Sequence, residues 1–125
     1  MMLNRKSSYH FKFEDLIVYQ KAITFAEFVN ELIKKFPKHE KYRLSSQFSK
    51  AADSIALNIA EGTSGSYAVF NRYLVISKGS ANECIACSTK AILRKYITEE
   101  EDEEIRKQIS EISKMIFSLI KSNKK

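Results

Sequence analysis

Apolar side chains recur at helical spacing along nearly the whole chain, and few residues interrupt them. Phe48, Ala52, Ile55 and Ile59 follow one another at steps of four, three and four, which places them on one face of a helix. Only three glycines and one proline occur among the 125 residues. A chain with this period and so few breaks is predicted to be all-α.

Capping and terminating residues divide the chain into four predicted helices. Pro37 stops the first, and Gly62 is expected to end the second in a left-handed conformation. Ser45, Ser66 and Thr98 are residue types that cap helix N-termini. The expected helices span residues 14–35, 45–62, 67–96 and 99–121. We therefore predict an antiparallel up-down four-helix bundle, with long helices 1, 3 and 4 and a shorter helix 2.

The predicted bundle occupies residues 13–121 as a single domain. Residues 1–12 are polar and basic and are expected to form a disordered tail, and residues 122–125 a frayed basic tail. No run approaches the roughly 18 apolar residues of a membrane span, and the first residues show no secretory-signal pattern. We therefore expect a cytoplasmic protein with no membrane partner.

The first predicted helix carries more apolar surface than one bundle core requires. Leu16, Tyr19 and Ile23 begin one stripe, and a second stripe lies about 100° round the helix. We predict that one stripe faces the core and the other a second copy of the chain. The interface candidates, all on the second stripe, are Val18, Phe25, Val29 and Leu32.

A polar stripe lies beside the apolar one on the second helix, without the Lys and Glu pattern of a solvated face. We interpret it as a hydrogen-bonded seam, made of Gln47, Ser54, Asn58, Glu61 and, from the third helix, Glu83. A catalytic or metal role for Glu61 and Glu83 is the less favoured alternative, because the ligand pattern of di-iron bundles is absent. Gly79 costs about 1 kcal/mol relative to alanine in a helix, so we expect the second helix to pack against it.

The charge is strongly basic outside one acidic run. The chain has 21 basic and 15 acidic residues, and six of the acids are consecutive at positions 99–104, which leaves 21 basic against nine acidic residues elsewhere. Such a surface favours polyanions through counterion release. The nucleic-acid-binding candidates are Lys38, Lys41, Arg43, Lys50, Arg72, Lys78, Lys90, Arg94 and Lys95, with Tyr42, Tyr67, Tyr73 and Tyr96 interleaved. The alternative is that these side chains only solvate the faces of the bundle.

Motifs for catalysis and cofactors are incomplete. Cys84 and Cys87 form a C-x-x-C in the middle of a long helix, where we expect two buried thiols rather than a redox or zinc site. The sequence after His39 lacks the second histidine of H-E-x-x-H, and residues 62–65 form a G-x-x-G without the α/β context of a KH domain. We therefore expect no cofactor, no metal and no enzymatic activity.

Several short sequence motifs together resemble those of a known family. They are Phe13-Glu14-Asp15-Leu16, Gln20-Lys21-Ala22, Gln47, Ala51-Ala52, Ser54-Ile55, Asn58-Ile59-Ala60-Glu61-Gly62, Phe70, Tyr73-Leu74 and Gly79-Ser80 with Glu83. In this order they resemble the S23 family, encoded in intervening sequences of bacterial 23S ribosomal RNA genes. The resemblance implies a helical bundle that is often a pentamer, related to the accessory protein of diversity-generating retroelements, which binds nucleic acid and a reverse transcriptase.

Two functions of different classes follow from these observations. The first is a non-enzymatic, self-associating bundle that binds RNA or DNA through a basic surface with little sequence readout. The second, which the resemblance implies, is a protein-interaction adaptor for a nucleic-acid enzyme such as a reverse transcriptase.

Overall fold

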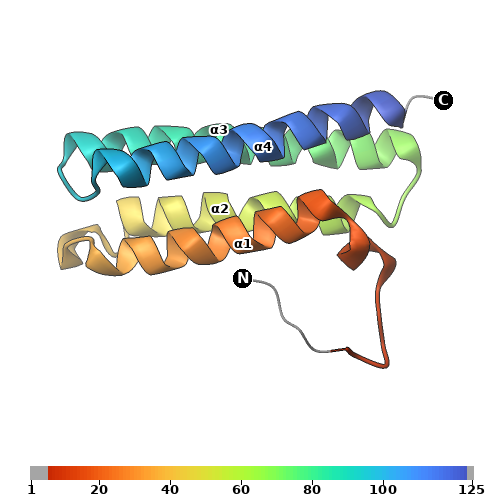
Figure 1. Ribbon diagram of the computed structural model, residues 1–125, viewed down its shortest axis with the longest axis horizontal. Helices are drawn as coiled ribbons and strands as arrows, with labels where there is room; N and C mark the ends of the chain where they lie inside the picture. Colours follow the sequence, from red (N-terminus) through yellow and green to blue (C-terminus); the bar gives the residue numbers. More distant parts are fainter. Residues whose placement is uncertain (1–5, 124–125) are drawn as a thin grey trace.

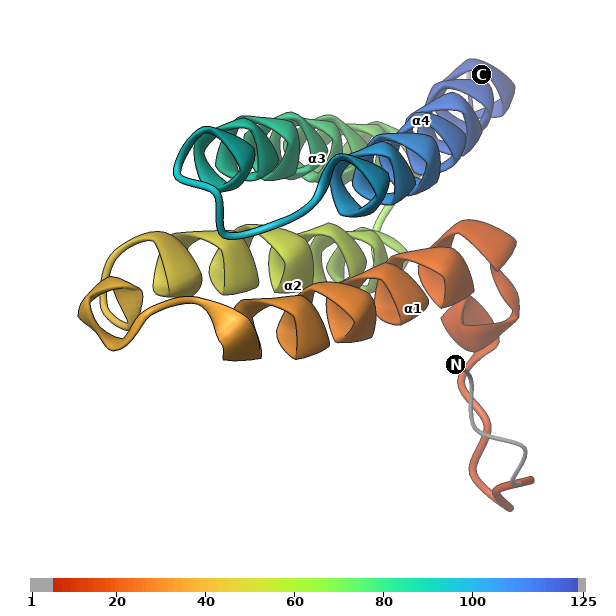
Figure 2. The ribbon, with the colours of Figure 1, turned by 60° about the vertical axis from the view of Figure 1, so that its left-hand side comes forward.

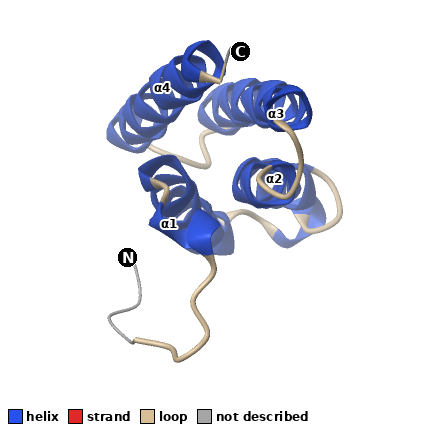
Figure 3. Cartoon of the chain, turned by 90° about the vertical axis from the view of Figure 1, so that its right-hand side faces the viewer, coloured by secondary structure: helices blue, strands red, loops and turns tan. Residues whose placement is uncertain are grey.

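The protein is a bundle of antiparallel helices in a computed structural model that describes residues 6–123. These residues form four α-helices and no strand: α1 (Ile17–Leu32), α2 (Leu44–Gly62), α3 (Tyr67–Leu93) and α4 (Glu99–Ser122). The pair α1 and α2 faces the pair α3 and α4 (Figure 1), and a view along the axes places the helices at four corners in chain order (Figure 3). The predicted all-α four-helix bundle is confirmed.

The first helix is shorter than predicted because its two ends are 3-10 turns. Lys12–Asp15 and Ile33–Lys35 are separate 3-10 helices, and Leu16, which precedes α1, is extended with φ −68° and ψ 123°. The Phe13 ring packs edge-on against Tyr19 beside this break, with ring centroids 5.1 Å apart. Because α1 spans 16 residues and α2 spans 19, α2 is not the shortest helix, contrary to the prediction.

Two of the three predicted N-caps are present. The Ser66 hydroxyl accepts a hydrogen bond from a backbone N–H of the first turn of α3 at 3.2 Å. The Thr98 hydroxyl accepts from Glu101 N–H at 3.1 Å, and the Glu101 carboxylate accepts from Thr98 N–H at 2.9 Å, which completes a capping box. Ser45 caps nothing, since α2 already begins at Leu44.

The glycines act differently from the prediction. Gly62 has no left-handed conformation; a Cβ there would lie 2.7 Å from the Cβ of Tyr73, so its role is to let α3 approach closely. Gly79 faces away from α2, and a Cβ at this position would meet nothing within 4 Å. The expected packing of α2 against Gly79 is therefore wrong.

The stripe assigned to a subunit interface lies in the core of its own chain. Val18, Phe25, Val29 and Leu32 are at most 6% exposed, so no surface remains on them for a second copy. The predicted interface is therefore wrong. The physical reason is that α1 packs against both α2 and α4, which takes a wider apolar arc than a single helix contact requires.

The polar seam exists, although it involves fewer of its predicted members. The Ser54 hydroxyl accepts a hydrogen bond from the Asn58 amide at 2.8 Å and one from the Ser80 hydroxyl of α3 at 2.9 Å. Ser77 donates to the carbonyl oxygen of Ile55 at 3.0 Å. By contrast, the predicted seam residues Gln47, Glu61 and Glu83 are exposed, so this part of the prediction is wrong. The hydroxyls hold α2 and α3 close together in a defined register.

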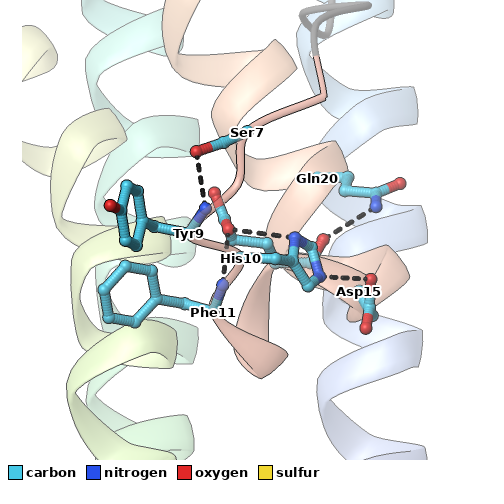
Figure 4. A network of polar contacts seen from close by, with 7 residues as sticks. Ser7, Tyr9, His10, Phe11, Asp15 and Gln20 are labelled. Carbon is cyan, nitrogen blue, oxygen red and sulfur yellow. Dashed lines mark hydrogen bonds and ion pairs between the residues drawn. The ribbon is translucent and has the colours of Figure 1, made fainter.

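The N-terminal segment turns away from the bundle before α1 (Figure 2). A polar network fixes its described part: the His10 ring lies 2.9 Å from an Asp15 oxygen and 3.3 Å from a Glu14 oxygen, and Phe11 N–H donates to Glu14 at 2.9 Å (Figure 4). Of the predicted tails, residues 1–5 and 124–125 lie outside the described residues. Asn123 is buried and donates a hydrogen bond to Asn71 at 3.0 Å.

Candidate nucleic-acid interface

Two connections that are far apart in sequence meet at one end of the bundle. The segment 33–43 joins α1 to α2, the segment 94–98 joins α3 to α4, and both lie at the end of the molecule that is on the left in Figure 1. Up-down topology requires this, because odd-numbered helices end where even-numbered helices begin. Basic residues of the two connections are thereby brought to a shared surface.

A buried carboxylate ties the two connections together. Glu40 is only 4% exposed, and its Oε2 accepts hydrogen bonds from the Tyr96 hydroxyl at 2.8 Å and from Arg94 Nη1 at 2.9 Å. Its Oε1 lies 3.3 Å from the Leu44 N–H, which donates to it at the start of α2. The Tyr96 ring also packs on Phe36, with centroids 5.2 Å apart. Glu40 therefore holds the start of α2 against the end of α3.

These contacts keep Glu40 ionised. The hydrogen bond from Tyr96 is the largest cause that lowers the pKa of Glu40, and the contacts with Leu44 N–H and Arg94 add to it, although burial opposes them. The same hydrogen bond raises the pKa of Tyr96, because ionising the phenol would remove the donor. The carboxylate therefore cancels one positive charge at this end, that of Arg94.

Six of the predicted candidates form what we call the basic end, five in the two connections and Lys90 in the last turn of α3: Lys38, Lys41, Arg43, Lys90, Arg94 and Lys95. All six are exposed. Arg94 is paired with Glu40, whereas within residues 6–123 none of the other five forms an ion pair. Lys90 belongs to this end because α2 and α3 are antiparallel with Ser54 opposite Ser80, so the last turn of α3 lies level with the start of α2.

Lys95 has a backbone conformation that suits glycine better. Its φ is 65°, the only positive value at a residue other than glycine in the described part of the chain. Tyr96 N–H donates to the Ala91 carbonyl at 2.9 Å and Lys95 N–H to the Ile92 carbonyl at 3.0 Å, the pattern of a Schellman motif. A left-handed lysine costs roughly 1–2 kcal/mol. The turn therefore carries a positive charge where glycine would be less strained.

The other three predicted contacts lie elsewhere. Lys50 is exposed in the second turn of α2 and flanks the basic end. Arg72 lies in the first half of α3, toward the opposite end of the bundle. Lys78 lines a groove of about 420 Å³ with residues of α4. The nine candidates therefore do not form one continuous surface.

The acidic run limits the basic end on one side. It begins α4, where Glu101 accepts from Lys35 Nζ at 2.7 Å and Asp102 accepts from Ser88 at 2.6 Å and from Arg106 at 2.9 Å. Despite partial burial, these donors lower the pKa of both carboxyls. Glu99, Glu100 and Glu103 of the run are exposed. A polyanion is therefore favoured over the α2 and α3 half of this end and repelled from the start of α4.

The buried thiols, the metal-binding residue types and the remaining grooves of residues 6–123 supply no further candidate site. Cys84 and Cys87 are free, fully buried thiols, as predicted, and burial raises the pKa of Cys87 to about 11. Within residues 6–123 no group of three His, Cys, Asp or Glu side chains could hold a metal ion. In the same range no helix is long and apolar enough to cross a membrane. The charged residues that line the groove of about 450 Å³ between α1 and α4 are Lys21, Glu104 and Glu111, and Lys21 lies 3.6 Å from Glu111.

The sequence analysis did not identify Glu40 as a site residue, and it did not predict that Tyr96 has a structural role as the hydrogen-bond donor to Glu40. A signal was available, because Glu40 is the sole acid in the basic stretch 34–43. A single carboxylate among so many Lys and Arg side chains can form an ion pair with a neighbour whatever the fold of the chain. Its actual partner, 56 residues away, could not be identified without the topology.

Residues 14–118 match the model of a protein family described as 23S rRNA-intervening sequence protein. The chain also resembles the crystal structure of a protein with unknown function from the S23 ribosomal protein family of Bacteroides thetaiotaomicron VPI-5482. The TM-score is 0.75 and the sequence identity 32%, over 84% of this chain and 99% of that one. Comparison with curated proteins finds no match.

Proposed function

The chain belongs to the 23S rRNA-intervening sequence protein family, and from this premise we propose that it is a non-enzymatic, cytoplasmic protein that binds RNA or DNA through its basic end. The observation that carries the proposal is the convergence of Lys38, Lys41, Arg43, Lys90 and Lys95 on one end of the bundle, without carboxylate partners within residues 6–123. Binding is mainly electrostatic, so sequence readout is weak.

Salt dependence of binding tests this function. We expect the affinity for a short RNA or single-stranded DNA to fall linearly with salt on logarithmic axes. Changing Lys38, Lys41 and Arg43 together to Gln should reduce the slope by about two, since each phosphate contact on a single strand contributes about 0.7. The matched control changes Lys107, Lys114 and Lys121 of α4 to Gln, which alters the net charge equally. Absence of binding at low salt, or equal effects of both triple changes, would contradict the proposal.

The adaptor function is the second candidate, and the outward face of α3 favours it. Ala68, Val75, Gly79, Ala86 and Leu93 recur at helical spacing on that face, and all are exposed, with Leu93 at 76%. Arg72 and Lys90 flank this stripe, and between them Val75, Gly79 and Ala86 form a small, uncharged surface of the kind that marks interaction sites. We propose that this face, instead of the α1 stripe, mediates self-association into a homo-oligomer such as a pentamer, or contact with a protein partner.

Oligomer mass tests the second candidate. Sedimentation of the unmodified chain should give a mass several times that of the 14.4 kDa protomer. Val75→Glu should reduce that mass, because it places a charge in the middle of the contact. Ser110→Glu on the exposed side of α4 is the control and should leave the mass unchanged. A monomeric unmodified protein that captures no partner would argue against this role.

A further inference from the structure

Tyr42 is an aromatic side chain at the tip of the connection between α1 and α2. It is 85% exposed, although a tyrosine ring is largely apolar. Its sequence neighbours Lys41 and Arg43 are also exposed, so an aromatic side chain lies between two positively charged ones at the tip. Single exposed aromatic residues are common on proteins. This one differs in its setting, because it stands within the basic end.

The tip is held firmly on both sides. Glu40 before it is 4% exposed and Leu44 after it is 2% exposed. Arg43 N–H donates to the Glu40 carbonyl oxygen at 2.9 Å, which closes a turn around Lys41 and Tyr42. The Glu40 carboxylate binds Arg94 and the Leu44 N–H. Because Glu40 and Leu44 are buried on either side of it, the backbone of Tyr42 is fixed before any ligand binds. A ligand that contacts the ring therefore loses little affinity to the ordering of the protein chain.

The charges around the ring suit a phosphate backbone. Lys41 Nζ lies 5.4 Å from the centroid of the Tyr42 ring, within the range of a cation–π contact. Arg43 follows directly, and Lys38 lies in the same connection. An aromatic face beside several ammonium and guanidinium groups is the combination with which proteins hold unpaired nucleotides, the base stacked and the phosphates paired.

We infer that Tyr42 is a stacking platform for an unpaired base, so that the ligand of the basic end is single-stranded nucleic acid. This inference rests on the proposed nucleic-acid binding. A base within a duplex is already stacked on both faces and paired at its edge, so it cannot reach the ring, whereas single strands and loops expose base faces. RNA and DNA share this chemistry, and titrations with strands of each kind distinguish them.

The test compares single strands with duplexes at equal salt. Twelve-nucleotide RNA and DNA strands that carry a fluorescent adenine analogue, and blunt hairpins of the same composition, are titrated with the full chain. We expect tighter binding of single strands than of hairpins, with quenching of the analogue. Tyr42→Leu should weaken single-strand affinity by about five-fold or more while hairpin affinity and salt slope stay unchanged. Tyr42→Phe should bind like the unmodified protein, because it keeps the ring.

Control variants separate the outcomes. Tyr67→Leu, at the opposite end of the bundle and 58% exposed, should change neither affinity. If the unmodified protein binds no strand at low salt, the proposed function itself fails. If single strands and hairpins bind equally and Tyr42→Leu has no effect, the stacking inference fails while the proposed function stands. If Tyr42→Leu loses affinity equally for single strands and hairpins while its thermal melting is unchanged, the stacking inference is also wrong. Comparison of the RNA and DNA arms shows whether the 2′-hydroxyl contributes.

Discussion

The Tyr96 hydroxyl donates a 2.8 Å hydrogen bond to Oε2 of Glu40, which lies 56 residues earlier in the chain. Through this bond the two connections at one end of the bundle act as one surface. Arg94 completes the pair of donors to the same oxygen at 2.9 Å. The contact combines a structural role with an electrostatic one, because the carboxylate joins the two connections and neutralises the charge of Arg94.

The first prediction concerns pH and Glu40. Its pKa is lowered in the folded protein from the ordinary 4.5, chiefly by the Tyr96 hydrogen bond. A lowered folded pKa stabilises the protein above the unfolded pKa, and this contribution is lost as pH falls through the folded value. Glu40→Gln should therefore be less stable than the unmodified protein at pH 7, with a difference that shrinks below about pH 4.5. Urea unfolding at several pH values measures this, and a difference independent of pH would contradict it.

The second prediction separates stability from binding at Lys95. Lys95→Gly should relieve the left-handed strain, and the gain should be less than about 1 kcal/mol because glycine also gains freedom in the unfolded chain. The same change removes one positive charge from the basic end, so nucleic-acid affinity should fall. Lys41→Ala is the matched control, because it removes one positive charge from the basic end and leaves the left-handed backbone of residue 95 unchanged. A Lys95→Gly protein that is no more stable in urea would show that the turn is not strained.

The third prediction concerns the hydroxyl pair between α2 and α3. Ser54 accepts from Ser80 at 2.9 Å and from the Asn58 amide at 2.8 Å. Ser54→Ala should lower the free energy of unfolding by about 1 kcal/mol, because the Ser80 hydroxyl loses its acceptor and the Asn58 amide keeps only the Ser54 carbonyl oxygen. The double variant with Ser80→Ala should cost less than the two single changes together. Additive single effects in urea unfolding would show that the hydroxyls do not interact.

The fourth prediction uses Gly79. Gly79→Ala should stabilise α3 by about 1 kcal/mol, since a Cβ there meets nothing within 4 Å in the single chain. If the outward face of α3 packs closely on another copy, the same methyl group should shift the oligomer toward protomers in sedimentation. Asn82→Ala, on the same face, is the control for a change that adds no bulk. Loss of stability in dilute protomer would contradict the open environment of Gly79.

The seam illustrates how far local sequence patterns reach. Small polar side chains beside an apolar stripe correctly indicated that Ser54 and Asn58 make hydrogen bonds. The pattern could not show that Glu61 and Glu83 point to solvent, because a helical stripe covers an arc and the edge of the packed surface within it depends on the neighbouring helix. The same holds for the basic candidates. The sequence predicted that they are exposed, but it could not predict which of them lie together at one end of the bundle.

Helix positions, two of the N-caps, the buried thiols and the all-α class follow from the order of residues alone, because each depends on contacts within a few turns of one helix. The burial of Val18 and Phe25 in their own core, the open environment of Gly79 and the pairing of Glu40 with Tyr96 were decided only when the four helices packed. These depend on how far each helix is rotated about its axis and on which ends meet. Such rotations and meetings come from long-range packing, which a periodic pattern along one helix does not encode.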